Sequence, residues 1–162
     1  MEIGNILALI GAVLAVAIPG IGSSFGMSWV QQAAAGVISE EPKKFGKTLI
    51  LQLIPSSATL YGFVVSFLVL LNTQIMGGYG FTQVEGMIIM AACLPIAIGG
   101  LFGTLGQAKV CVAGVRMIGK DESLSGRALT MAVFIELFIL FTLIVSILSV
   151  FGVSPTYTYP GA

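Results

Sequence analysis

The sequence predicts an all-α membrane protein with four transmembrane helices. Hydrophobic residues make up 57% of its 162 residues and charged residues only 9%, and the mean hydropathy of +1.05 is far above that of soluble domains. A chain of this length holds about four spans of roughly 20 to 25 residues with short connections. In addition, the apolar stretches repeat in pairs, and one acid, Glu136, lies inside the last of them.

The four expected helices cover residues 3–37, 46–72, 84–118 and 125–152. The first has no basic segment before it and is too long for the apolar region of a signal peptide, so we expect it to be retained as a helix. All seven basic residues lie in or near the first and third connections: Lys43, Lys44, Lys47, Lys109, Arg116, Lys120 and Arg127. By the positive-inside rule these two connections are cytoplasmic. The outer side then holds the 72–84 connection and both termini, with Glu2, Glu85, Tyr157 and Tyr159.

The chain reads as two tandem copies of one helical hairpin, residues 1–76 and 77–162. A shift of 80 residues carries Leu49, Leu60, Val65, Ser66 and Leu68 onto Leu129, Leu140, Val145, Ser146 and Leu148. A shift of 78 carries Gly22 onto Gly100 in the first helix of each copy. Both hairpins have the same orientation, so the repeat is parallel, unlike the inverted repeats of many transporters. A parallel repeat is compatible with the assembly of subunits into a ring.

The first and third expected helices are rich in glycine, alanine and serine, whereas the second and fourth are rich in leucine, isoleucine, valine and phenylalanine. Small residues allow close helix approach, as in the pairs Gly22 with Gly26 and Gly99 with Gly103. We therefore expect subunits to assemble into a concentric ring with the first and third helices inside. The alternative is a compact four-helix monomer whose small residues mark the bundle interior.

Glu136 is the candidate functional residue, because an ionised carboxylate deep in a bilayer needs a proton, a cation or a positive partner. Glu136 and Ser57 each lie 11 residues into an expected helix, and Gln107 lies 11 residues before the end of another. The three form a polar layer about 16 Å from the cytoplasmic helix ends. Ile54, Ser57 and Tyr61 share one helix face. The first hairpin has Ser56 at the position matching Glu136, which leaves one such carboxylate per four helices.

Pro55 adds a backbone oxygen to this layer, since it removes a helical N–H and disturbs the preceding turn. Carboxylate, amide, hydroxyl and carbonyl oxygens suit a hard cation, and one carboxylate balances the charge of one Na⁺. A proton requires only the desolvated carboxyl group. Gln107 and Ser57 could instead make interhelical hydrogen bonds without an ion, and Tyr61 could simply pack. Lys109 could neutralise Glu136, although it lies about 200° around the helix from Gln107.

These residues resemble the proteolipid (c or K) subunit of V-type and A/V-type rotary ATPases in its duplicated four-helix form, closest to the bacterial sodium-transporting branch. The resemblance covers nearly the whole chain. Its most specific segments are Pro42-Lys43-Lys44-Phe45-Gly46, Leu49-Ile50-Leu51-Gln52-Leu53-Ile54-Pro55, Leu60-Tyr61-Gly62-Phe63, Leu94-Pro95-Ile96-Ala97, Gly106-Gln107-Ala108-Lys109-Val110 and Glu136.

The resemblance implies a homo-oligomeric rotor ring in the cell membrane. Each protomer would carry one ion past a stator subunit that supplies an arginine, and central-stalk subunits would link the ring to a soluble head that hydrolyses ATP. The protomer itself would not be an enzyme, which agrees with the absence of a phosphate-binding GxxxxGKT/S loop and of histidine. Nucleic acid is not an expected partner.

The resemblance also implies an ion site. The Na⁺ ligands would be the Glu136 carboxylate, the Gln107 side chain, the Ser57 hydroxyl and the Ile54 carbonyl, with Tyr61 bonded to the carboxylate. Sodium carriers of this family have a second glutamine where this chain has Ala58, so a water molecule or Thr59 would have to replace it, although Thr59 lies about 200° around the helix from Ser57. This departure keeps a proton-carrying rotor open as the alternative.

Two further functions are weighed against the rotor. A small cation or drug exporter would line a cavity with aromatic residues around its carboxylate, and Phe134, Phe138 and Phe141 do lie near Glu136 in the sequence. A structural proteolipid that organises other membrane proteins would need no membrane carboxylate.

Overall fold

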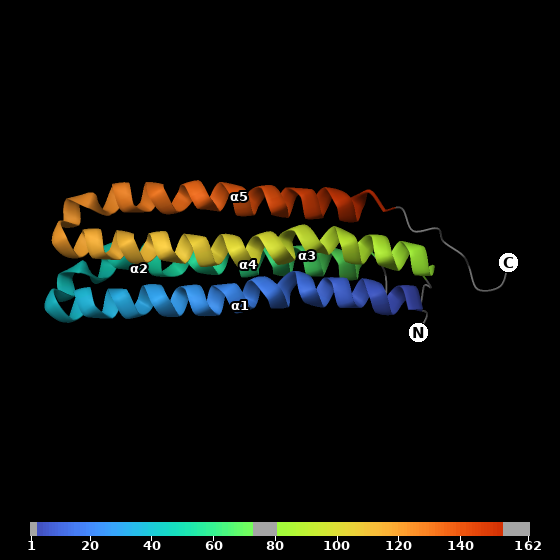
Figure 1. Cartoon of the computed structure of the whole chain (residues 1–162), viewed down its shortest axis with the longest axis horizontal. Helices are drawn as coiled ribbons and strands as arrows, with labels where there is room; N and C mark the ends of the chain where they lie inside the picture. The colour runs from blue at the N-terminus through green and yellow to red at the C-terminus, as the bar shows by residue number, and fades with distance from the viewer. Residues whose placement is uncertain (1–2, 73–80, 154–162) are drawn as a thin grey trace.

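The computed structural model describes residues 3–72 and 81–153, which form a bundle of long helices (Figure 1). In chain order these are α1 (Ile3–Glu40), the 3₁₀ turn η1 (Pro42–Lys44), α2 (Phe45–Leu53), η2 (Ile54–Ser56), α3 (Ser57–Asn72), α4 (Gln83–Lys120), η4 (Glu122–Leu124) and α5 (Ser125–Phe151). No strand occurs in the two described ranges. The all-α prediction is confirmed. Glu2, the boundary at 76/77 and the tail residues Tyr157 and Tyr159 lie outside the described residues.

Four helical segments in the described ranges are long and apolar enough to cross a membrane: Ile3–Glu40, Pro42–Leu71, Gln83–Lys120 and Glu122–Phe151. α1 and α4 end at residues 40 and 120 rather than at the expected 37 and 118. The sequence limits were set by the apolar run, which marks what lies in hydrocarbon. The backbone hydrogen bonds of a helix can continue beyond that boundary into water.

The second span is broken near its middle rather than being one continuous helix. Pro55 lies in the 3₁₀ turn η2, between α2 and α3. It has no N–H to donate to the carbonyl four residues earlier, and the chain compensates with tighter i to i+3 bonds, of which the Ser57 N–H to Ile54 carbonyl bond is one. The disturbance expected at Pro55 is therefore present, and α3 begins directly at Ser57.

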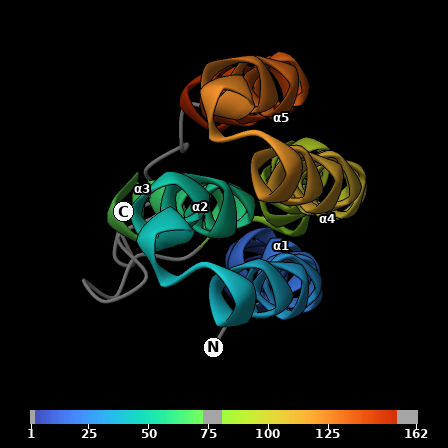
Figure 2. The ribbon, with the colours of Figure 1, turned by 90° about the vertical axis from the view of Figure 1, so that its left-hand side faces the viewer.

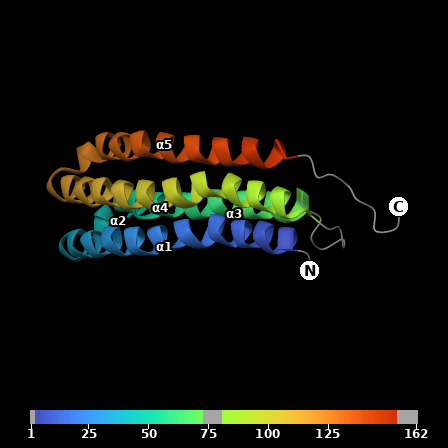
Figure 3. The same ribbon diagram turned by 45° about the vertical axis from the view of Figure 1, so that its right-hand side comes forward.

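α4 lies between α1 and α5 and packs closely against both, while α2 and α3 pack mainly against α1 and α4 from one side (Figures 2 and 3). Glycines permit the close approach of α1 and α4. A side-chain carbon at Gly11 would lie only 2.7 Å from the Met90 Cα, and one at Gly86 would collide with the backbone of Gly4. The close packing of the two small-residue helices is thus observed within one protomer.

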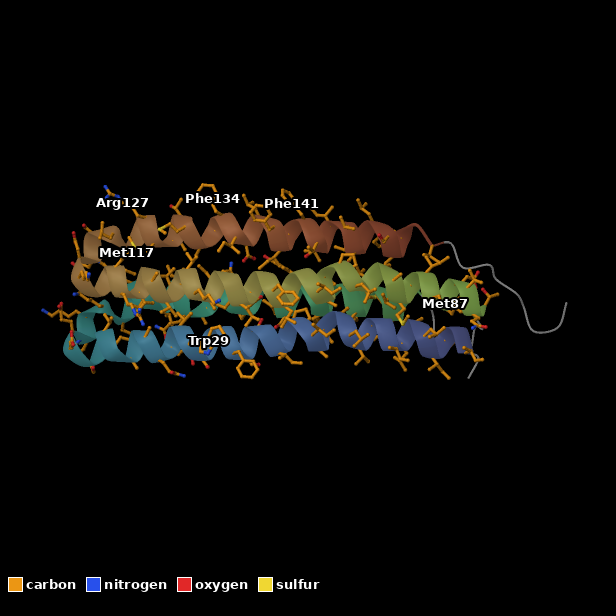
Figure 4. All side chains as sticks on the ribbon, in the orientation of Figure 1. Trp29, Met87, Met117, Arg127, Phe134 and Phe141 are labelled. Atoms are coloured by element: carbon orange, nitrogen blue, oxygen red, sulfur yellow. The ribbon has the colours of Figure 1, made fainter. Side chains whose placement is uncertain are left out.

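The bulky helices expose their large side chains. On α5 these include Phe134, Phe138 and Phe141, each more than half exposed, and on α3 they include Phe63 and Phe67. Figure 4 shows Phe134 and Phe141 projecting from α5 away from the other helices. In water such a surface would be unfavourable, whereas lipid or a neighbouring protomer can cover it.

The two hairpin turns lie together at one end of the bundle (Figure 1). The buried Lys44 ammonium donates to the Glu41 carboxylate at 2.7 Å and to the Gly119 carbonyl at 2.7 Å, and so reaches the C-terminal end of α4. Lys47 pairs with Glu122 across the two loops at 3.1 Å. This arrangement has the orientation that a parallel repeat predicts, with both loops on one side.

Candidate functional site

The Glu136 carboxylate receives hydrogen bonds from two other helices. The Ser57 hydroxyl donates to Oε2 at 2.9 Å and the Tyr61 phenol donates to Oε1 at 2.6 Å, both from α3. The Gln107 amide of α4 donates to Oε2 at 2.6 Å. The structure thus brings together Glu136, Gln107, Ser57 and Tyr61, which lie up to 79 positions apart in the chain.

The break in the second span explains how α3 contributes to this site. Ser57 is the first residue of α3, and Tyr61 follows one turn later on the same face. Ile54 is in the 3₁₀ turn just before them, where its carbonyl accepts the Ser57 N–H. Because a carbonyl oxygen has two lone pairs, the Ile54 oxygen retains capacity for a second partner.

Gln107 is fully buried, and only one of the two polar atoms of its side-chain amide has hydrogen-bond partners. Its Nε2 atom donates to Glu136 and lies 3.4 Å from the Ala132 carbonyl, while its Oε1 atom is buried with no hydrogen-bond partner. Buried polar atoms are nearly always paired, and an unpaired one costs about 1–3 kcal/mol. A cation or a donor at this oxygen would remove that cost. Sequence reasoning missed the Ala132 carbonyl, whose only signal is its position one turn before Glu136.

Lys109 does not neutralise Glu136. Its side chain is exposed, and the ion pairs within the described ranges are Lys44 with Glu41 and Lys47 with Glu122. Gln107 and Lys109 point in different directions, as the helical angle between them requires. In the same ranges no three histidine, cysteine, aspartate or glutamate side chains gather as a metal-binding group. The site contains one acid.

Ala58 and Thr59 turn away from the carboxylate. Ala58 is fully buried and lies near Gly100 on α4, where a side-chain carbon on that glycine would be 3.7 Å from the Ala58 Cβ. The Thr59 hydroxyl is buried without a hydrogen-bond partner beside a groove lined by α1 and α3. Successive helical residues are about 100° apart, so when Ser57 faces Glu136 the next two positions face α4 and α1. The structure does not bring Thr59 to the site.

The comparisons with known proteins agree with this architecture. A model of the ATP synthase C-subunit family matches the chain twice, at residues 10–69 and 90–149. The chain is 35% identical over 147 residues to the V-type sodium ATPase subunit K of Enterococcus hirae, an alignment that covers 91% of this chain and 92% of that protein. It is 34% identical over 148 residues to the A-type ATP synthase subunit K of Methanocaldococcus jannaschii, covering 91% of this chain and 63% of that longer relative.

Proposed function

Because the chain belongs to the ATP synthase C-subunit family, as a duplicated proteolipid of a rotary ATPase, we propose that each copy carries one Na⁺ at Glu136. The protein is an ion-translocating membrane component and does not itself hydrolyse ATP. The sodium function of the Enterococcus hirae relative supports the choice of ion.

The observation that carries the proposal is the set of polar groups around one membrane carboxylate. The oxygen ligands would come from Glu136, the Gln107 Oε1 atom, the Ser57 hydroxyl and the Ile54 carbonyl. Tyr61 would hold the carboxylate in position. Such a set fits a hard monovalent cation. Rotation of the Gln107 amide exchanges its nitrogen and oxygen, so one side chain can donate to the empty carboxylate and offer oxygen to a bound ion.

The site differs in charge with and without bound Na⁺, and this difference can determine where the ion is held and where it is released. With Na⁺ bound, Glu136 is effectively neutral and can face lipid. Beside a stator arginine the unloaded anion is favoured, so the ion leaves for an aqueous path. In this proposal identical protomers form the rotor ring, and the stator and central-stalk subunits are its partners.

A proton is the second candidate ion. The specific observation in its favour is Ala58, which supplies no side-chain oxygen where sodium carriers of the family have a glutamine. A proton needs only the Glu136 carboxyl group and none of the other oxygens.

A labelling experiment with a hydrophobic carbodiimide separates the two ions. This reagent enters lipid and attacks carboxyl groups there, so Glu136 should react while the acids of the hairpin loops, which are exposed to water, should not. Sodium should protect Glu136, and protection should weaken at lower pH because protons compete for the same group. Gln107→Ala should raise the Na⁺ concentration needed for protection at least about tenfold, equivalent to about 1.4 kcal/mol.

Gln52→Ala is the matched control, because Gln52 is also buried but bonds to Thr48 within α2. It should leave the Na⁺ titration unchanged, and Glu136→Gln should abolish both labelling and transport. If Na⁺ gives no protection at any pH, the proton-carrying rotor is the better assignment. If Glu136→Gln still transports ions, the assigned site is wrong.

We also propose that both hairpin loops face the cytoplasm and that both termini face outward. The basic residues of the loops support this orientation. A membrane-impermeant maleimide should label Lys43→Cys only from the cytoplasmic side and Val84→Cys only from the outer side. The native Cys93 and Cys111 are buried and give little background. The reverse labelling pattern would reject this topology.

A further inference from the structure

α4 has a cationic strip on its exposed face near the hairpin end. Lys109, Arg116 and Lys120 lie at positions i, i+7 and i+11, so their side chains leave the helix in nearly the same direction. A surface depression of about 230 Å³ is lined by Arg116, Lys120, Ala113 and Met117. Figure 4 labels Met117 near the hairpin end of α4. The ion pairs found within residues 3–72 and 81–153 include none of these three cations.

The same face becomes apolar toward the other end of α4. Phe102 is seven residues before Lys109 and is 66% exposed, and Ile98 is eleven residues before it and is 52% exposed. The face thus changes from apolar to cationic over about 10 Å. Phospholipids have the same order of groups, with a charged phosphate next to hydrocarbon chains.

Lys109 lies at a depth where lipid surrounds the helices, which points to a lipid as the anion that pairs with it. Gln107 touches Glu136, and Gly114 faces Ala128, where an added side-chain carbon would be 3.0 Å from the Ala128 Cβ. Lys109 therefore lies level with the α5 segment between these two residues, where Met131 and Phe134 are exposed for lipid contact. A bare ammonium at that level is costly unless it reaches the interface or meets an anion.

We propose that this strip binds the phosphate headgroup of an anionic phospholipid. Lys109 and Arg116 hold the phosphate, and the acyl chains lie along Phe102 and Ile98. The long side chains of Lys109 and Arg116 can converge across the 10 Å between their positions on the helix. A soluble anion would not use the apolar half of the face, and for that reason the strip is assigned to a lipid.

The test uses the assembled full-length protein in phosphatidylcholine vesicles. Electron paramagnetic resonance measures how much spin-labelled phosphatidylglycerol or phosphatidylcholine is immobilised at the protein surface. The wild-type protein should favour phosphatidylglycerol. Lys109→Gln and Arg116→Gln should each lower this preference about fivefold, which corresponds to about 1 kcal/mol per basic side chain. Lys109→Arg should retain the preference.

Lys43→Gln is the charge-matched control, since Lys43 is an exposed cation at the same end but outside the strip. It should leave the lipid preference nearly unchanged. An equal loss in Lys43→Gln and Lys109→Gln would show a diffuse surface potential and overturn the proposal. So would equal binding of the two lipids by the wild type, or displacement of phosphatidylglycerol by millimolar inorganic phosphate. If Lys109→Gln dissociates the oligomer without changing lipid preference, the strip is a contact between protomers and the lipid assignment is wrong.

Discussion

Glu136 is held by three side chains that have different parts in the proposed ion cycle. Ser57 and Gln107 both donate to Oε2 and can both present oxygen to a cation. Tyr61 donates to Oε1 at 2.6 Å, and in this proposal it holds the carboxylate in position.

Tyr61→Phe should therefore weaken Na⁺ binding without changing the shape of the site. A hydrogen bond to a charged acceptor contributes about 1.5–3 kcal/mol, so we expect the Na⁺ concentration that protects Glu136 from carbodiimide to rise about tenfold or more. Labelling of Glu136 over a range of Na⁺ concentrations measures this change.

Thr59→Val provides the control for Tyr61→Phe. It removes a hydroxyl two residues from Ser57 that makes no hydrogen bond to Glu136. The Na⁺ titration should stay at the wild-type position. A shift like that of Tyr61→Phe would mean that Thr59 reaches the ion, contrary to its position beside the groove between α1 and α3.

At the scale of the elements, sequence patterns predicted the four spans and the depth at which polar residues meet. Counting residues from the helix ends was sufficient for Glu136, Gln107 and Ser57, because helix rise is nearly constant. Helical geometry places Thr59 about 200° from Ser57 and so away from the site, but it does not show which helices Ala58 and Thr59 meet. The 3₁₀ turn at Pro55 changes the rotation between α2 and α3, and only the packed structure shows which helices those two residues meet.

Lys44 is a second case that the sequence could not resolve. By composition it is one of seven basic residues that set the orientation in the membrane. In the structure its ammonium is buried and bonded to the Gly119 carbonyl, 75 positions away. No local pattern indicates such a partner. The bond joins the first hairpin loop to the end of α4, where a cation also interacts favourably with the helix dipole.

Lys44→Gln should loosen the contact between the two hairpins. Loss of a buried charged donor leaves Gly119 without this partner, and we expect a destabilisation of about 1–3 kcal/mol, seen as a lower thermal unfolding temperature in detergent. Lys47→Gln is the control, because the Lys47 and Glu122 side chains are 44% and 55% exposed and such pairs contribute about 0–1 kcal/mol. Equal effects of the two substitutions would contradict a special role for Lys44.

At the scale of the whole molecule, the protomer has two unlike free sides. The first hairpin has an open groove of about 560 Å³ between α1 and α3, beside which the Ser23 and Thr59 hydroxyls are buried without hydrogen-bond partners. The second hairpin presents the edge-to-face pair Phe138 and Phe141 on α5. Two different surfaces favour head-to-tail contacts, which close into a ring when the rotation between protomers permits.

The purified protein should therefore be a closed symmetric oligomer in which α1 and α4 line the inner circumference and α3 and α5 the outer one. The physical reason is the width of the helices, because the small residues of α1 and α4 allow closer packing at the smaller radius. Cryo-electron microscopy of the detergent-solubilised oligomer measures this arrangement directly. Bulky helices α3 and α5 at the inner surface would refute the packing argument, and a monodisperse monomer would favour the compact four-helix bundle. If the ring forms with Glu136 near its outer surface, each loaded carboxylate can reach a stator outside the ring, which the proposed ion carriage requires.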